Sequence, residues 1–172
     1  MRTTFDKERF NKDYMTGLEG ENRYKEYIHK YTDYYLFTIS ESEQPFKDFD
    51  FIIYNETTQK LITVEIKTDT ANTHNIAVQI YSSSKTNTKL KLPNFAYTLN
   101  SGVFATKADE FVTYNICSNS LYIANTKDLQ NHIFRNPALR KTIANKNKSE
   151  FTGLVLLPKK DWIDIGRVIA LN

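Results

Sequence analysis

Hydrophobic and polar residues alternate most regularly over residues 46–67. Runs of β-branched and aromatic residues lie on either side of the polar stretch 55–59. Alternation on both sides of a short polar interruption is typical of an antiparallel β-hairpin. The segment therefore predicts two paired strands.

The polar side chains of this hairpin gather on one of its two faces, because alternate residues of a strand point to opposite faces. One face holds Asp48, Asp50, Ile52 and Tyr54 with Leu61, Thr63, Glu65 and Lys67, and the other holds Phe49, Phe51, Ile53, Ile62, Val64 and Ile66. Carboxylates beside an ammonium group among apolar residues are costly to bury unless something binds there. A hard divalent cation would satisfy the carboxylates.

The acidic residues and the lysine also form a sequence motif, in which Asp50 is followed on the next strand by Glu65-Ile66-Lys67. The motif resembles the D…(D/E)xK signature of the PD-(D/E)XK nuclease superfamily, which includes restriction endonucleases, Holliday junction resolvases and phage nucleases. Phe49 stands where the family's name has a proline. The resemblance implies a restriction-endonuclease-like fold over residues 1–172, a single α/β domain with a mixed central β-sheet flanked by helices.

The same resemblance implies roles for the hairpin residues. Asp50, Glu65 and the main-chain carbonyl of Ile66 would hold Mg²⁺, or alternatively Mn²⁺. Lys67 would hold the attacking water and favour its hydroxide form. Asp48 shares the face of Asp50, and Asp50 is preferred because an apolar run follows it directly. Lys67 could instead be a plain salt-bridge partner of Glu65 in a catalytically inactive relative.

A helix is predicted before the hairpin, over residues 17–31, because Thr16-Gly-Leu-Glu19 fits a capping box. Residues 1–15 are expected to form an arm or a short helix. Apolar residues recur at amphipathic spacing, at Leu18, Tyr24, Tyr27, Ile28 and Tyr31. Glu21 falls on the same inward stripe. It resembles the glutamate that the superfamily's first helix turns toward the active site, where it could complete a second-metal or water site. Alternatively, Glu21 lies at the helix edge or pairs with Lys67.

Two further strands are predicted, at 34–39 and 75–81. The order of helix, strand and acidic hairpin is that of the superfamily's core. In the second strand Ile76, Val78 and Ile80 alternate with Gln79. Several branches of the superfamily place a polar residue on this strand, so Gln79 could line the site. An exposed strand glutamine fits the pattern equally well.

Two later segments could contact a phosphate backbone. The loop 82–99 carries Lys85, Lys89 and Lys91 among hydroxyl and amide side chains, which suits a phosphate contact or a solvated loop. Residues 101–116 resemble the Ser-Gly-(Ile/Val)-x-x-Thr-x-Ala-Asp segment of a phage-associated branch, a helical turn that leads into a strand at 111–116. Thr106 and Lys107, expected at the start of this turn, could meet a phosphate or merely cap the turn.

The remainder of the chain predicts a strand at 121–124, a helix over 126–135 with Thr126 as its cap, and a basic turn at 138–144. A buried strand at 153–158, a turn or short helix at 159–163 and a closing strand at 167–171 follow. Trp162 is interpreted as core packing.

Composition narrows the class of protein. The 172 residues, 40% of them hydrophobic, suffice for one domain with a substantial core. The single cysteine, Cys117, excludes an internal disulfide and a cysteine-rich zinc site. The three histidines lack zinc-ligand spacing, and the sequence holds no glycine-rich phosphate loop. The chain has no signal-peptide pattern or long apolar run, so an intracellular, cytoplasmic protein is expected. The net charge of +3 permits a polyanionic partner.

The resemblance to the PD-(D/E)XK superfamily implies a Mg²⁺-dependent DNA endonuclease that acts on duplex or branched DNA and is similar to resolvases or phage recombination nucleases. A homodimer would let two sites cut two strands, although no residue in the sequence identifies an interface. The alternatives are a catalytically inactive nucleic-acid-binding or assembly protein of the same fold, and an RNA-directed nuclease.

Overall fold

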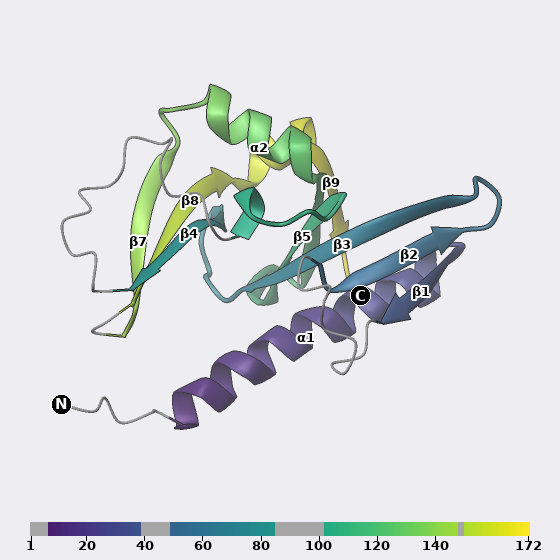
Figure 1. The fold of residues 1–172 in the computed structure, drawn as a ribbon, viewed down its shortest axis with the longest axis horizontal. Coiled ribbons are helices and arrows are strands. Elements are labelled where there is room, and N and C mark those ends of the chain that lie inside the picture. Colours follow the sequence, from purple (N-terminus) through teal and green to yellow (C-terminus); the bar gives the residue numbers. More distant parts are fainter. Residues whose placement is uncertain (1–6, 39–48, 85–101, 148–149) are drawn as a thin grey trace.

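The computed structural model describes residues 7–38, 49–84, 102–147 and 150–172, and these form two β-sheets with a helix on each side of the larger one (Figure 1). The larger sheet contains, in spatial order, β1 (Tyr34–Thr38), β2 (Phe51–Asn55), β3 (Lys60–Asp69), β5 (Glu110–Asn115), β6 (Ser120–Asn125) and β9 (Gly166–Ala170). The smaller sheet contains β4 (Asn75–Ser84), β8 (Glu150–Pro158) and β7 (Arg140–Asn147). The helices are α1 (Lys7–Tyr31) and α2 (Thr126–Arg135), and the 3₁₀ turns are η3 (Gly102–Phe104), η4 (Ile116–Ser118) and η5 (Lys159–Asp164).

The larger sheet is mixed, which confirms the predicted fold class. β3 and β5 are parallel, and the other neighbouring strands of this sheet pair antiparallel. β2 and β3 form the predicted hairpin. None of the helices in the described segments is long and apolar enough to cross a membrane.

Helix α1 begins well before the predicted start. Thr16 lies inside the helix, where its hydroxyl donates a 2.8 Å hydrogen bond to the carbonyl of Lys12. A threonine hydroxyl can cap the start of a helix or, as here, bond a main-chain carbonyl one turn earlier within the helix. The capping-box prediction was therefore wrong. At the other end, the hydroxyl of Thr32 donates to the carbonyl of Ile28 and accepts from the amide of Tyr34, which leads the chain into β1.

Helix α1 covers one face of the larger sheet. Tyr24, Tyr27 and Ile28 are buried on the apolar row of the hairpin, as predicted. Tyr31 is instead 57% exposed and stacks on Tyr27. The helix lies close to β3 at Gly20, where a β-carbon would lie 2.2 Å from the Thr68 hydroxyl oxygen. Glu21, the next residue of α1, interacts electrostatically with Asp50 and Lys67.

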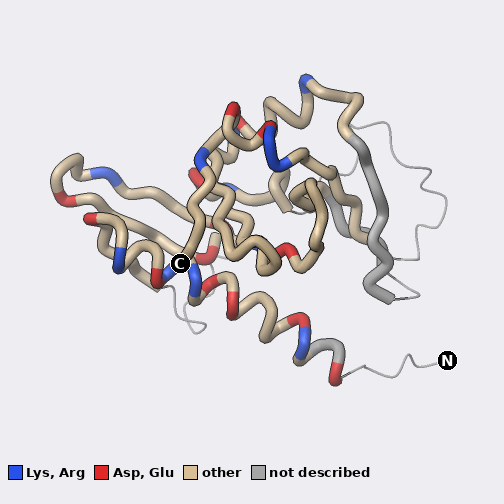
Figure 2. Tube along the Cα trace, turned by 180° about the vertical axis from the view of Figure 1, so that it is seen from behind, with Lys and Arg blue, Asp and Glu red and all other residues tan. Residues whose placement is uncertain are grey.

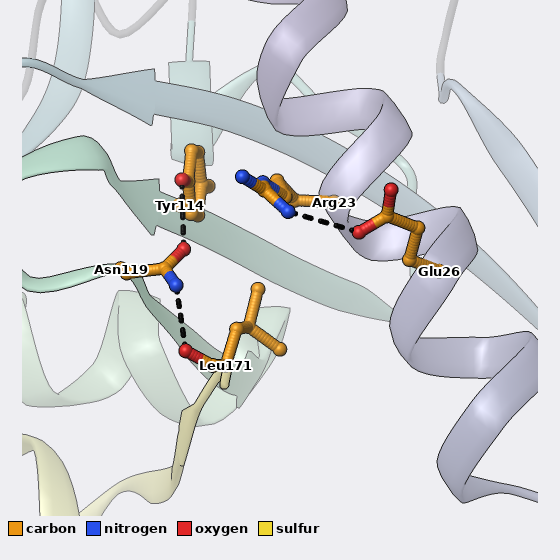
Figure 3. A network of polar contacts seen from close by, with 5 residues as sticks. All are labelled: Arg23, Glu26, Tyr114, Asn119 and Leu171. Atoms are coloured by element: carbon orange, nitrogen blue, oxygen red, sulfur yellow. Dashed lines mark hydrogen bonds and ion pairs between the residues drawn. The ribbon is translucent and has the colours of Figure 1, made fainter.

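Leu171, just after the edge strand β9, is held on the face of the sheet that α1 covers. The hydroxyl of Tyr114 on β5 donates to the side chain of Asn119, whose amide donates to the carbonyl of Leu171 (Figure 3). From α1, Arg23 points toward Tyr114 and pairs with Glu26 at 3.1 Å (Figure 3). The sheet, its final strand and α1 thus form one packed unit.

The other face of the larger sheet packs against the smaller sheet and α2. Its core includes Ile76 and Val78 of β4, Leu129 of α2 and Trp162, which is buried as predicted. Gly102 has a φ of +61°, and a β-carbon there would lie 2.0 Å from the carbonyl oxygen of Gln79. Both the backbone conformation and the close approach require glycine at this position.

Several boundaries in the C-terminal half differ from the prediction. The expected basic turn at 138–144 lies largely within β7, because its backbone pairs with β8 from Arg140 onward. The cap of α2 is Asn125, not Thr126, since the Asn125 side chain accepts hydrogen bonds from the amides of Lys127 and Asp128. β4 extends past the predicted end to Ser84, with a register shift between Gln79 and Tyr81.

Candidate active site

The central feature of the site is the position of Asp50, just before β2. The last β2–β3 pair is Phe51 with Val64, and the Asp50 amide donates a 2.8 Å hydrogen bond to the Val64 carbonyl. The Asp50 carboxylate then accepts a 2.7 Å bond from the Ile66 amide. Where the main-chain ladder ends, the side chain of Asp50 therefore takes over as the partner of β3 and is held beside it.

This bond also orients the main chain at Ile66. The N–H and C=O groups of one strand residue point to the same side of the strand. Because the Ile66 amide faces Asp50, its carbonyl lies on the edge of β3 that faces away from β5. The carboxylate of Asp50 and this carbonyl are two hard oxygen donors on the same edge.

Glu65 and Lys67 form an ion pair on the face of β3 opposite α1. The Glu65 side chain is 13% exposed and the Lys67 side chain is 40% exposed. In the parallel register with β5, Glu65 lies beside Phe111 and Lys67 beside Thr113. The pair is thus partly covered, with Lys67 more exposed than Glu65.

Glu21 interacts electrostatically with this group from α1. Burial raises the pKa of Glu21, the negative charge of Asp50 raises it further, and the positive charges of Lys25 and Lys67 oppose this only in part. Burial alone would lower the pKa of Lys67, but the charges of Glu65, Asp50 and Glu21 outweigh it and raise that pKa. The structure therefore brings Glu21, Asp50, Glu65 and Lys67 into one interacting cluster, in which the lysine is held in its charged form.

The pKa of Glu21 leads to a stability prediction. A carboxyl group whose pKa is raised by folding costs stability as the pH rises from its unfolded value through its folded value. Glu21→Gln is therefore expected to stabilise the metal-free protein at neutral pH, with a gain that shrinks as the pH falls through the raised pKa and is absent below the ordinary value of 4.5. Urea unfolding over a pH series measures this, with the exposed Glu19→Gln on the same helix as control. A variant less stable than the parent protein at neutral pH would contradict the burial of Glu21 as an unfavourable charge.

Other residues predicted for the site lie elsewhere or outside the description. Gln79 is half-buried on β4 of the smaller sheet, with its main-chain carbonyl against Gly102. Asp48, Lys85, Lys89 and Lys91 lie outside the described residues.

The prediction that Thr106 and Lys107 start a helical turn was wrong. The turn is η3, and both residues follow it. The Thr106 amide donates to the Gly102 carbonyl and its hydroxyl oxygen accepts from the Ala108 amide, both at 3.1 Å. These bonds occupy the Thr106 amide in closing the turn before β5, while Lys107 is exposed.

The sequence analysis predicted no role for two further residues of β5 and its start, Thr113 and Asp109. Thr113 lies next to Lys67 across the β3–β5 pair, is 1% exposed, and its hydroxyl oxygen has no hydrogen-bond partner among the described residues. The carboxylate of Asp109 accepts bonds from the amide and hydroxyl of Thr63, at 2.9 and 2.8 Å, and so fixes the start of β5 against β3. The only sequence signal for Thr113 is a hydroxyl residue within the otherwise apolar run 111–114.

The oxygen donors of the cluster are few. Within the described residues, no three His, Cys, Asp or Glu side chains are grouped closely enough to hold a metal ion. Mg²⁺ is commonly held by only one or two carboxylates, with waters and substrate phosphate completing its octahedral shell. Asp50 and Glu65 are the carboxylates that could serve in this way, and the Asp50 carboxylate keeps acceptor capacity beyond its bond to Ile66. Their oxygen atoms are of the chemical type that Mg²⁺ prefers.

Comparison with known proteins finds no sequence match and a distant structural likeness. No protein family and no curated protein matches its sequence. A solved structure that resembles it is that of a bacterial homing endonuclease, I-Ssp6803I, with 14% sequence identity over 89% of this chain and 87% of that chain and a TM-score of 0.48. At this distance the likeness does not bear on the chemistry of the cluster, which depends on the residues described above.

Proposed function

We propose that this protein is a metal-dependent nuclease that hydrolyses phosphodiester bonds in DNA at the cluster of Asp50, Glu65, Lys67 and Glu21. The arrangement that supports this function best is Asp50 bound to the Ile66 amide, next to the Glu65–Lys67 pair. It joins two carboxylates, a main-chain carbonyl and a charged lysine at the end of one hairpin. Hydrolysis of a phosphodiester needs such a combination of negative metal ligands and a positive group near the attacking water.

In this proposal Asp50, Glu65 and the carbonyl of Ile66 hold Mg²⁺ or Mn²⁺, which would neutralise charge on the phosphate and promote ionisation of a bound water. Glu21 adds a further carboxylate, whose pKa is raised by burial and by the charge of Asp50. A bound cation would offset these effects and lower the pKa of Glu21.

Lys67 acts by charge in this proposal and does not remove a proton itself. Its raised pKa keeps the ammonium group protonated, so it donates hydrogen bonds to the attacking water and stabilises the hydroxide form. Its ion pair with Glu65 fixes the direction of the ammonium group. Lys67 is thus a positioned cation whose effect grows as negative charge develops on the reacting oxygens.

The proposed substrate is duplex or branched DNA, with homodimers cutting two strands, as in recombination nucleases of phages. The net charge of +3 is compatible with a polyanion. In Figure 2, Lys and Arg alternate with Asp and Glu along α1, so the positive charges of the described residues do not form one continuous stripe there. Binding should therefore depend moderately on salt and owe more to the site itself than to a basic surface.

Incubation with supercoiled plasmid and with a branched DNA junction tests the function. Cleavage is expected with Mg²⁺ or Mn²⁺ and none with EDTA. Binding that retards the DNA without cleavage in either metal would contradict the nuclease and support the alternative, an inactive nucleic-acid-binding protein of this fold. Cleavage of RNA in preference to both DNAs would contradict the choice of substrate.

A further inference from the structure

We infer that two copies of this chain pair through β1 and join their larger sheets edge to edge. β1 is the terminal strand of the sheet and pairs with β2 over all five of its residues, Tyr34 to Thr38. An edge strand exposes a row of main-chain donors and acceptors, and proteins usually protect such edges with charges, proline or bulges. β1 reads Tyr-Tyr-Leu-Phe-Thr and its described pairing with β2 contains no register shift. Within its described residues, β1 therefore carries no charge, proline or bulge that would protect the edge.

An apolar surface adjoins this edge on the side opposite α1. Tyr35 and Phe37 of β1 are 54% and 52% exposed, and Leu61 of β3 is 62% exposed. Cross-strand register places Tyr35 beside Tyr54, Tyr54 beside Leu61, and Phe37 beside Ile52. We call the surface of these five residues the aromatic face. A contiguous exposed apolar patch of this kind marks a site of interaction.

A second copy of the chain is the partner that this edge fits. Antiparallel pairing of β1 with itself about Leu36 sets Tyr35 opposite Phe37 of the second copy, and the reverse pair follows from the two-fold symmetry. Aromatic pairs directly across two strands stabilise a sheet. Such an interface is self-complementary, as a two-fold dimer requires. The five side chains of the aromatic face carry no positive charge to meet phosphates, which disfavours nucleic acid as the partner here.

The pairing has a consequence that rests on the proposed function. A two-fold axis perpendicular to the joined sheet leaves the aromatic faces of both copies on one side. Glu65 and Lys67 alternate along β3 in phase with Leu61, so both ion pairs also open on that side. β3 and its counterpart would be five strand spacings apart, about 24 Å across the sheet. Two active sites facing one way at this spacing suit paired cuts in a single DNA molecule.

Light scattering coupled to size exclusion tests the interface without reference to cleavage. The protein is expected to elute at twice the chain mass of 20.1 kDa. Phe37→Lys, which places a charge on the edge strand, should give monomers. Leu61→Lys, on the same face but two strands from the edge, should stay dimeric. A monomeric parent protein, a dimeric Phe37→Lys variant, or equal disruption by Leu61→Lys would overturn the inference.

A crosslinking test applies even if Phe37→Lys fails to fold. Leu36 faces its own symmetry mate in the proposed pairing, so Leu36→Cys in a Cys117→Ser background should form a disulfide-linked dimer on mild oxidation. Leu61→Cys in the same background should not. Absence of the Leu36 crosslink, or equal crosslinking at both positions, would contradict pairing about Leu36. A dimer without nuclease activity would leave the interface standing and refute only the proposed function, and an active monomer would do the reverse.

Discussion

Lys67→Ala is expected to lower Mg²⁺-dependent plasmid cleavage by about 100-fold, the effect typical of removing one preorganised charged donor from a reacting oxygen. The lysine is charged, half covered and paired with Glu65, so its ammonium group is held in place before substrate arrives. Its loss should reduce the rate at saturating DNA while leaving DNA affinity nearly unchanged, because the group acts mainly in the transition state. Single-turnover cleavage and DNA retardation measure the two effects separately.

Two variants serve as controls for Lys67→Ala. Lys127→Ala removes an exposed lysine from the start of α2 and should cleave at the parent rate. Lys67→Arg keeps the positive charge but changes its geometry, and partial activity is expected. Cleavage by Lys67→Ala at the rate of Lys127→Ala would show that Lys67 only balances the charge of Glu65, the other interpretation open from the sequence.

The hairpin strands β2 and β3 were predictable because their signal is local. Alternation in the hairpin fixes which residues face α1, and the burial of Phe51, Ile53, Val64 and Ile66 follows that pattern. The start of α1 was not predictable from its capping motif, because Thr16 can bond the carbonyl of Lys12 as well as cap a helix. Residue types that occur both at helix ends and inside helices, such as threonine, therefore predict the start of a helix poorly.

The candidate site was predictable only in part, since it depends on how distant elements meet. The inward stripe of α1 identified Glu21, but the close approach at Gly20 that places Glu21 near Asp50 is a tertiary feature. The hydroxyl of Thr113 within an apolar run does not reveal its neighbour, because its position beside Lys67 comes from the parallel pairing of β3 and β5. Such pairing joins segments that are far apart in the chain.

The placement of Thr106 and Gln79 shows a second limit. The motif at 101–109 correctly predicted a helical turn before β5. Thr106, however, closes this turn through hydrogen bonds that its amide donates to the Gly102 carbonyl and its hydroxyl oxygen accepts from the Ala108 amide. The main-chain carbonyl of Gln79 lies against Gly102. The sequence pattern cannot show whether a residue contributes such a main-chain contact or a side chain to the site. Thr106 thus closes a turn, whereas a site role for the Gln79 side chain stays a prediction.

Substitutions of Asp50 should separate its structural role from its proposed metal-binding role. Asp50→Ala removes the acceptor for the Ile66 amide, which is expected to cost about 1–3 kcal/mol of stability and to abolish cleavage. Asp50→Asn keeps an amide oxygen in reach of that donor but loses the negative charge. It should unfold nearly as the parent protein does and still fail to cleave, because a neutral amide is a poor substitute for a carboxylate ligand of Mg²⁺.

Asp48→Asn is the matched control, because Asp48 shares the alternation of Asp50 in the sequence. Thermal unfolding, Mg²⁺ titration calorimetry and plasmid cleavage, applied to all three variants, give the readouts. Only the two Asp50 variants should lose Mg²⁺ binding, and only Asp50→Ala should melt at a clearly lower temperature. Full cleavage by Asp50→Asn together with loss of cleavage by Asp48→Asn would transfer the ligand role to Asp48 and leave Asp50 as the residue that ends the β2–β3 ladder. Asp50→Asn and Asp48→Asn both leave an oxygen acceptor for the Ile66 amide, so the hairpin is expected to stay folded in both variants. A difference in cleavage between them would therefore report on metal binding and not on folding.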